Sequence, residues 1–582
     1  MLRFILPLLI LPFVTSSAFA DDQCDIHYRV TPQYDSSPRR LDVVVTFPAE
    51  GKRESWLRMQ PEWAGVKDFS AFLTPSTEQG RGVKVEGTPE PYRWKVEHAP
   101  EGSVRVSYQV RAALPAPDDE KVQQQDDLYR TQIGNNWFQF FGYGVFPSVE
   151  AWDDTRSGRM CVTLVQPADR SGPLLGSYFN GTTQAQAAAT LTGSHAVLRH
   201  AFYAGGPGWR VVPRTVAGGP VITASRGRLG LDDSSFADRV SGLLETHRRF
   251  WGEAQSPQQT VVRTPNNSVA NYGGTLVRQA AVLHVGKDFG PNSESFEFLI
   301  GHENLHQWLP HRLGGPETGG AEQVARHYWL SEGFTDYYAH RLLLADGLWT
   351  LDRYAAQLTR MLRTYWRSPA RQAPADKIAP RFFSDRDTGR QMYARGELLA
   401  MAWDRELRLK DAAGLDGVLR SLILSQAEAT QARPARERVL AALSERLGPG
   451  PRQQVLTVID EGRSFDLEEG LAGPCFTLGW DAVPRWVPGF DVKSMSSPTR
   501  QATGVVVDGP AYRAGLRDGM TLQGWSIYGG DTSKEILLKV KTEEGSQDLR
   551  YWPVDGSTER LPTLTVRAGA KIDTACLGWI RR

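Results

Sequence analysis

The segment 299–311, LIGHENLHQWLPH, contains two histidines four positions apart, with a glutamate directly after the first. On an α-helix, His302 and His306 share one face and can both bind one metal ion. Glu303 lies beside them, where a carboxylate can take a proton from an attacking water instead of binding the metal. Two histidines at this spacing also arise by chance in ordinary helices. Because zinc needs at least a third protein ligand, the histidine pair alone does not predict a zinc site.

The best candidate for the third ligand is Glu332, in the segment 328–343, YWLSEGFTDYYAHRLL. Asp336 lies one helical turn further along the same face, where it can accept a hydrogen bond from a ligating imidazole. Alternatively, both carboxylates belong to a solvated helix face. The many aromatic residues around them favour a packed helix, in which a carboxylate needs a partner. We therefore expect one Zn²⁺ per chain, with a fourth position open for water, as in catalytic zinc sites.

The residues before this site have the pattern of a β-rich domain. Short alternating apolar runs at 41–47, 103–110 and 160–165 predict strands, and Pro and Gly clusters separate them. The segment 114–127 predicts a solvated loop. We expect an N-terminal β-sandwich-like domain over 21–224.

From about residue 234 the apolar period becomes helical. Helices are predicted over 236–252, 351–366, 395–409 and the 417–446 region. A mainly helical catalytic domain is therefore expected over 225–465, and both histidines lie in it.

The last part of the chain, 470–582, returns to β character. In the segment 503–522 a strand is predicted to run into Gly509, followed by a short helix, a second glycine at Gly519 and another strand. This order is similar to the core of bacterial PDZ domains, which bind extended peptides by adding a strand to a sheet edge. Another kind of β-rich domain can contain the same turn.

Composition places limits on the partners. The 582 residues predict two to four domains. Lys and Arg number 67 against 66 Asp and Glu, so the formal net charge is +1. This balance gives no support to a nucleic-acid partner, which requires a basic excess or stripe.

The first twenty residues have the features of a secretory signal: a positive start at Arg3, an apolar stretch and an Ala-Phe-Ala ending before Asp21. A buried N-terminal helix is the alternative. No later stretch approaches 18 apolar residues, so we expect no integral membrane segment in the mature chain. The predicted location is periplasmic or secreted.

Four cysteines follow the signal, and an exported protein can keep disulfides. Of the three possible pairings, sequence position favours Cys24 with Cys161 and Cys475 with Cys576. Buried free thiols are the alternative.

The motif HENLHQW followed by WLSEGFTDYY resembles the gluzincin metallopeptidases, specifically the glycyl-aminopeptidase family with a C-terminal PDZ domain. The resemblance covers most of the mature chain. It implies a multidomain α+β protein with an N-terminal β-sandwich-like domain, a thermolysin-like mainly helical catalytic domain and a C-terminal PDZ-like domain.

A third motif, MYARGELLAMAWDRELR at 392–408, is similar to a Tyr-x-Lys-Gly segment of that family, with Arg395 in place of the lysine. The resemblance implies that Tyr393 donates a hydrogen bond to the oxyanion of the tetrahedral intermediate.

The family's Gly-Gly-Leu-Glu-His segment, on the strand that binds the substrate backbone, corresponds here to Gly273, Gly274, Thr275, Leu276 and Val277. The glutamate that would hold a free substrate amine is thus replaced by Leu276. We expect weak cleavage of free amino-acid amides and better cleavage of peptides that extend past this place. In the alternative, Glu317 or Glu322 supplies the missing charge.

Together these features predict a zinc metallopeptidase that acts on peptide or protein substrates, with a second peptide ligand possible at the PDZ-like domain. The alternative is a non-catalytic PDZ-type peptide-binding protein with a structural zinc site. A structural site usually has four protein ligands and has no use for the base Glu303 or for Tyr393.

Overall fold

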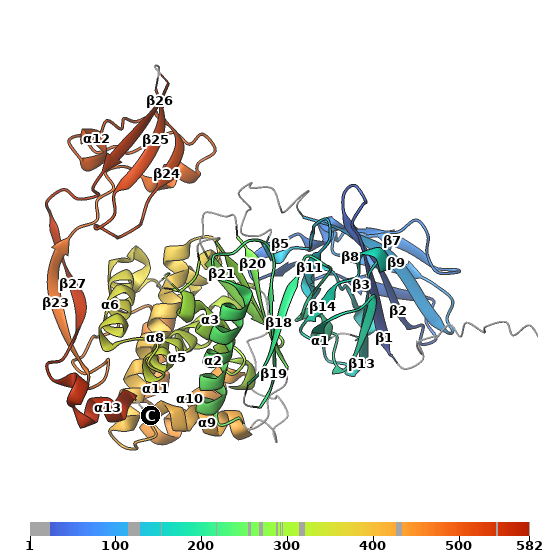
Figure 1. Ribbon diagram of the computed structural model, residues 1–582, viewed down its shortest axis with the longest axis horizontal. Helices are drawn as coiled ribbons and strands as arrows, with labels where there is room; N and C mark the ends of the chain where they lie inside the picture. The colour runs from blue at the N-terminus through green and yellow to red at the C-terminus, as the bar shows by residue number, and fades with distance from the viewer. Residues whose placement is uncertain are drawn as a thin grey trace, which may run out of the picture. The chain divides into compact units, whose positions relative to one another are not determined.

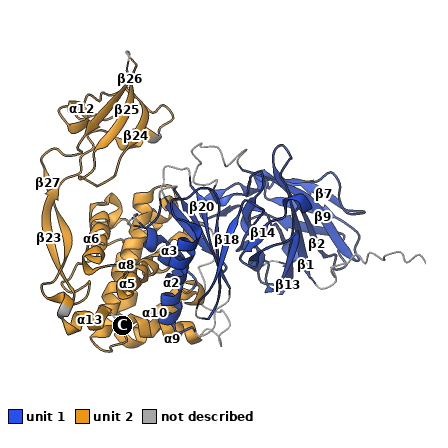
Figure 2. Ribbon diagram, in the orientation of Figure 1, with its two compact units in different colours: residues 1–307 blue, residues 308–582 orange. Residues whose placement is uncertain are grey.

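The protein is described by a computed structural model, which covers residues 24–113, 128–152, 154–216, 218–253, 258–266, 272–286, 289–291, 293, 295–313, 321–425, 434–542 and 545–580 (Figure 1). The predicted signal at 1–20, the predicted loop at 114–127 and Glu317 lie outside the described residues. The chain divides into two compact units, residues 1–307 and residues 308–582 (Figure 2).

The first unit begins with a sheet-rich region, as the alternating apolar runs predicted. In the strand Arg40–Pro48 every second side chain is buried, because successive residues of a strand point to opposite faces. The first sheet has the spatial order β16 (Gln186–Gly193), β13 (Gly158–Val165), β1 (Ile26–Gln33), β2 (Arg40–Pro48), β9 (Ser103–Arg111) and β6 (Leu73–Pro75). The second has the order β12 (Ser148–Val149), β3 (Glu54–Arg58), β8 (Arg93–Glu97) and β7 (Lys84–Gly87). The third has the order β10 (Gln132–Ile133), β11 (Phe138–Phe141), β17 (Phe202–Gly205), β14 (Pro173–Gly176) and β15 (Asn180–Thr183).

The same unit contains a fourth sheet, which carries the segment expected to bind substrate. Its spatial order is β18 (Arg210–Val216), β19 (Gly219–Ser225), β20 (Gln259–Pro265), β22 (Ala280–Val285) and β21 (Tyr272–Val277). Helix α2 (Asp233–Trp251) begins where the Asp232 side chain accepts a hydrogen bond from the Ser235 N–H, and it ends at Gly252 with φ 74°. Helix α3 (Phe296–Leu305) follows the sheet.

The second unit is helical up to about residue 460, as predicted. Its helices are α4 (Ala321–Ala325), α5 (Tyr328–Ala345), α6 (Leu351–Arg367), α7 (Ala375–Ile378), α8 (Arg386–Arg408), α9 (Gly414–Ser425), α10 (Ala435–Leu447) and α11 (Gly450–Gln454). Within this unit α5 and α8 pack along each other at its centre (Figure 1). Thr350 and Asp385 cap the first turns of α6 and α8 with their side chains.

The end of the chain is again β-rich. Strands β23 (Phe476–Pro484) and β27 (Thr558–Val566) form an antiparallel ribbon, and β24 (Thr521–Ser526), β25 (Ile536–Thr542) and β26 (Gly545–Tyr551) form a three-stranded sheet. The predicted short helix is α12 (Pro510–Arg513), and the final helix is α13 (Thr574–Ile580). The strand predicted before Gly509 is not regular; there Asp491 N–H donates to Thr503 O and Val506 N–H donates to Gly489 O.

Both cysteine pairs predicted from the sequence are disulfide-bonded, Cys24 with Cys161 and Cys475 with Cys576. The first bond joins Cys24, two residues before β1, to Cys161 on β13. The second joins the residue just before β23 to α13. None of the helices in the described part of the chain combines the length and the hydrophobicity that a bilayer span requires.

Candidate metal centre and peptidase site

The two histidines of the opening motif lie at the end of α3. The helix ends at Leu305, one residue before His306, whose backbone still has helical angles (φ −58°, ψ −17°). His302 and His306 therefore share one side of the chain, as the spacing predicted. The helix cannot continue far because Pro310 has no N–H and restricts the residue before it.

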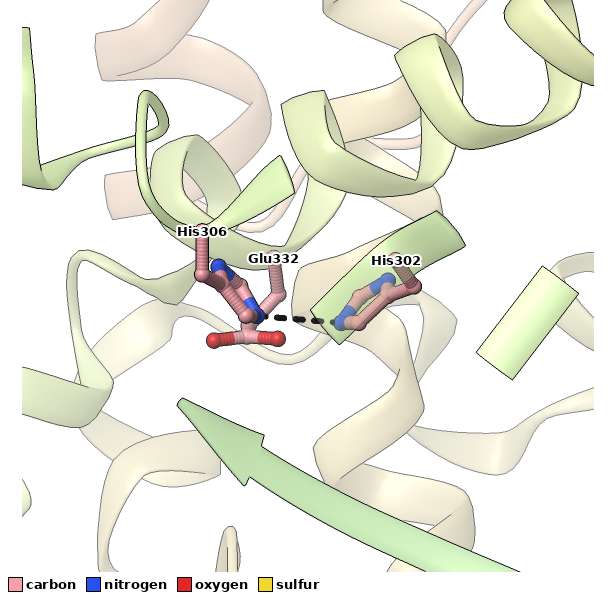
Figure 3. A group of neighbouring side chains, drawn as sticks. All are labelled: His302, His306 and Glu332. Atoms are coloured by element: carbon pink, nitrogen blue, oxygen red, sulfur yellow. Dashed lines mark hydrogen bonds between the residues drawn. The ribbon is translucent and has the colours of Figure 1, made fainter. Parts of the chain in front are cut away.

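The two imidazoles converge. Their Nε2 atoms lie 3.1 Å apart, and the ring planes are nearly perpendicular at 88°. Glu332, half-buried on α5, is the third member of the group: one ligand atom each from His302, His306 and Glu332 lies within 4.8 Å of the others. Figure 3 shows the three side chains pointing toward one another.

This donor set fits zinc. Two nitrogens bound to zinc at about 2.0–2.1 Å with tetrahedral angles lie roughly 3.3 Å apart, which is close to the 3.1 Å between the imidazoles. Two imidazoles and one carboxylate are also the ligand types of the thermolysin-like catalytic sites, which leave one position open. Among the described residues, the group offers three candidate ligands, fewer than the four typical of a structural zinc site.

Close packing of α5 against α8 fixes the position of Glu332 on its helix. A Cβ atom on Gly396 would lie 1.7 Å from the Trp329 carbonyl oxygen, and one on Gly333 would lie 2.5 Å from the Gly396 Cα. Glycine at both positions lets the two backbones touch. Gly333 directly follows Glu332, and Gly396 comes three residues after Tyr393, so this crossing positions both candidate side chains.

Polar groups further along the same two helices strengthen this packing. The Tyr337 hydroxyl on α5 donates to Asp404 on α8 at 2.7 Å. Arg341 donates to both carboxylate oxygens of the buried Asp416 on α9. These buried charges are paired and hydrogen-bonded, as a low-dielectric interior requires.

Tyr393 and Arg395, neighbours in one motif, have different surroundings. Tyr393 is half-buried, and its ring stacks on Phe382 with a centroid distance of 6.0 Å. Arg395 is fully buried and donates to the carbonyls of Ala370, Arg371 and Ala373. Burial lowers its pKa to about 10. Arg395 therefore holds the turn at 370–373 against α8, a structural role.

The segment 273–276 lies on β21, at the edge of its sheet, as expected for a strand that adds a substrate. Gly274 passes directly beside Glu303, because a Cβ atom at Gly274 would lie 2.7 Å from the Glu303 Cγ, Cδ and Oε1 atoms. Glu303 is 6 % exposed. The carboxylate thus packs on the bare backbone of the edge strand, and a side chain at this position would displace it.

The remaining predicted residues have the following places. Thr275 and Leu276 are half-buried on β21, and Asp336 is half-buried on α5, one turn after Glu332. Glu322 is exposed on α4, 3.8 Å from Arg326.

Tyr129 was not predicted from the sequence. Its hydroxyl donates to the Gly274 carbonyl oxygen at 3.4 Å. Burial raises the pKa of this hydroxyl, and the negative charge of the nearby Glu303 raises it further. Because Tyr129 and Gly274 are 145 residues apart, no local pattern signals this contact.

Comparison with known proteins places the site in context. The profile of the M61 glycyl aminopeptidase family matches residues 295–379, which contain both histidines, Glu303 and Glu332. Among solved structures, the chain is similar to an aminopeptidase N family protein from Idiomarina loihiensis, with 18% identity and a TM-score of 0.67 over 95% of this chain and 100% of that chain.

The chain is also similar to a variant of the M1 zinc metallopeptidase from Deinococcus radiodurans bound to a Tyr-Ser-Ala substrate, with 16% identity and a TM-score of 0.47 over 76% of this chain and 94% of that chain. No curated protein matches the chain in sequence. The family match and the shared fold of the first structure support a gluzincin-type peptidase.

Proposed function

We propose that this protein is a zinc metallopeptidase that hydrolyses peptide bonds, with His302, His306 and Glu332 as the metal ligands. The convergence of their three ligand atoms within 4.8 Å carries the proposal. Zinc, when bound, would supply a Lewis acid that polarises the scissile carbonyl and makes water more acidic.

Glu303 is the general base. It takes a proton from the attacking water and returns it to the leaving amine. Its packing against Gly274 supports this role, because the carboxylate then lies beside the strand along which a peptide would extend. Tyr393 donates to the developing oxyanion, and loss of one such donor costs about a hundredfold in rate. Asp336 accepts a hydrogen bond from a ligating imidazole and fixes its orientation.

The backbone of the segment 273–276 binds the substrate in an extended form. At the place of a free substrate amine the side chain is Leu276, which offers no charge. An unpaired buried ammonium costs several kcal/mol, so the protein prefers peptides that extend past Leu276 on the N-terminal side. Matched peptides with free and acetylated N-termini test this preference. Loss of cleavage on acetylation would show that another acid, such as Glu322, binds the amine.

Two features outside the site extend the proposal. Residues 1–20 direct export, and the two disulfides fit an oxidising compartment. The module within 470–582 is PDZ-like and binds an extended peptide. The turn at Gly509 followed by α12 supports this part of the proposal. The proposed domains are 21–224, 225–465 and 470–582.

The central experiment measures cleavage of a peptide library by the purified mature protein, with sites mapped by mass spectrometry. Phenanthroline should abolish cleavage and added zinc should restore it. A protein that contains a full complement of zinc and cleaves none of the peptides would instead be a non-catalytic binding protein.

A further inference from the structure

The hydrogen-bonding groups of β21 divide into two sets. Val277 and Ala280 are paired across a two-residue turn, so they exchange the first hydrogen bonds of the β21–β22 hairpin. In an antiparallel pair the direction of these groups alternates along the strand. Gly273, Thr275 and Val277 therefore bond to β22, whereas Tyr272, Gly274 and Leu276 present their N–H and C=O groups at the open edge.

Gly274 is the open-edge residue that lies against the base. A Cβ at Gly274 would meet the Glu303 carboxylate at 2.7 Å, so its backbone is beside the proton-accepting group. A peptide that adds antiparallel to β21 forms two hydrogen bonds with Gly274: its C=O accepts from the Gly274 N–H, and its own N–H donates to the Gly274 carbonyl.

Tyr129 already donates to that carbonyl. Its hydroxyl lies 3.4 Å from the Gly274 oxygen. The ring is fixed by edge-to-face contacts with Trp63 at 5.8 Å and His284 at 5.3 Å, and by Phe141 at 5.9 Å. The hydroxyl is thus held at the strand edge by packing, and it cannot withdraw without repacking three aromatic rings.

We propose that Tyr129 is a specificity-determining residue, which donates to the Gly274 carbonyl and thereby competes for this acceptor with the backbone N–H of the substrate residue opposite Gly274. The inference rests on the peptidase function proposed above and deepens it. At this position the substrate is held by the Gly274 N–H and by its side chain, so the protein accepts a substrate that lacks a backbone N–H there.

The test compares the wild type with Tyr129→Phe, which keeps the ring packing and removes only the hydroxyl. A backbone hydrogen bond contributes about 0.5–1.5 kcal/mol, so the freed carbonyl should lower KM for peptides by about two- to tenfold, with kcat changed less than about twofold. Tyr108→Phe is the matched control, because the buried Tyr108 hydroxyl also donates to a backbone carbonyl, that of Val145 at 2.8 Å, far along the chain from β21.

A second series identifies the substrate atom. In a cleaved peptide, each non-scissile amide is replaced in turn by an ester, which removes one N–H. In the wild type the ester opposite Gly274 should bind as well as the amide, whereas in Tyr129→Phe it should raise KM by about two- to tenfold. Equal ester penalties in the two proteins, or a higher KM in Tyr129→Phe, would overturn the proposal. A wild type that cleaves no peptide would refute the peptidase function itself, which separates the two failures.

Discussion

The substitution Gly274→Ala examines the contact between the edge strand and the base most directly. The added methyl would lie 2.7 Å from the Cγ, Cδ and Oε1 atoms of Glu303. Optimal contacts between carbon atoms are about 3.5–4.0 Å, so the carboxylate must move by roughly 1 Å. The obstructing atoms are the end of a flexible side chain, so the fold should tolerate the change.

The effect on catalysis should be much larger than the effect on stability. A misplacement of about 1 Å in a catalytic group can cost about a hundredfold in rate, which corresponds to about 2.7 kcal/mol of activation free energy. We expect kcat to fall by about ten- to a hundredfold. Zinc content should stay the same because Glu303 is not a proposed ligand. Alanine is no worse than glycine in a strand, so the melting temperature should not fall by more than a few degrees.

The neighbouring glycine offers a matched control. A Cβ atom on Gly273 meets nothing within 4 Å, so Gly273→Ala adds the same methyl to the same strand without touching the base. Steady-state kinetics on one peptide, with zinc content and melting temperature for each variant, complete the comparison. Equal rates in Gly274→Ala and Gly273→Ala would refute the claim that the strand backbone positions Glu303.

Three further predictions address the metal, the helix crossing and the response to acid. Glu303→Gln should keep about one zinc per chain and lose turnover, whereas Glu332→Ala should lose the metal; full zinc occupancy in the latter would mean that the third ligand is another residue. Gly396→Ala should destabilise the protein by about 1–3 kcal/mol or more, because the methyl meets backbone at 1.7 Å, while Gly242→Ala, whose Cβ meets nothing within 4 Å, should cause no fall in melting temperature. Burial and the charge of Arg226 lower the pKa of His284 to about 3, so below pH 6.5 the unfolded chain binds a proton that the native chain does not. The free energy of unfolding therefore decreases as the pH is lowered, by up to about 1.4 kcal/mol per pH unit. His284→Gln should flatten the slope of melting temperature against pH between 6.5 and 4.5, and an unchanged slope would contradict the assignment.

Local patterns predicted several helices and strands of the fold. The helical period at 351–366 corresponds to α6 (Leu351–Arg367), and the alternating run at 41–47 lies within β2 (Arg40–Pro48). Both signals come from neighbouring residues, because period 3.6 or period 2 is enough to specify the element. The segment before Gly509, where a strand was expected, makes separate backbone bonds to residues 489 and 491 instead of a continuous ladder.

The candidate ligands could be predicted from the sequence for a similar reason. The spacing of His302 and His306 is a property of one helix, and Glu332 is marked by its aromatic neighbours. The contacts at Gly274 are different, since Glu303 and Tyr129 reach it from distant parts of the chain. Only the folded backbone shows which of the two glycines contacts Glu303, because the sequence alone does not distinguish Gly273 from Gly274.

The contacts of Gly274 with Glu303 and Tyr129 depend on the register of the β21–β22 hairpin. A one-residue slip of β21 against β22 would send each side chain to the opposite face and exchange the bonded and open-edge groups. Thr275 or Gly273 would then take the place of Gly274 opposite α3. Thr275 would press a branched side chain into the Glu303 carboxylate, and either residue would move the carbonyl that Tyr129 now reaches. The two-residue turn between Val277 and Ala280 fixes this register. The proposed base, the strand edge and the tyrosine are therefore aligned by the register that this turn sets.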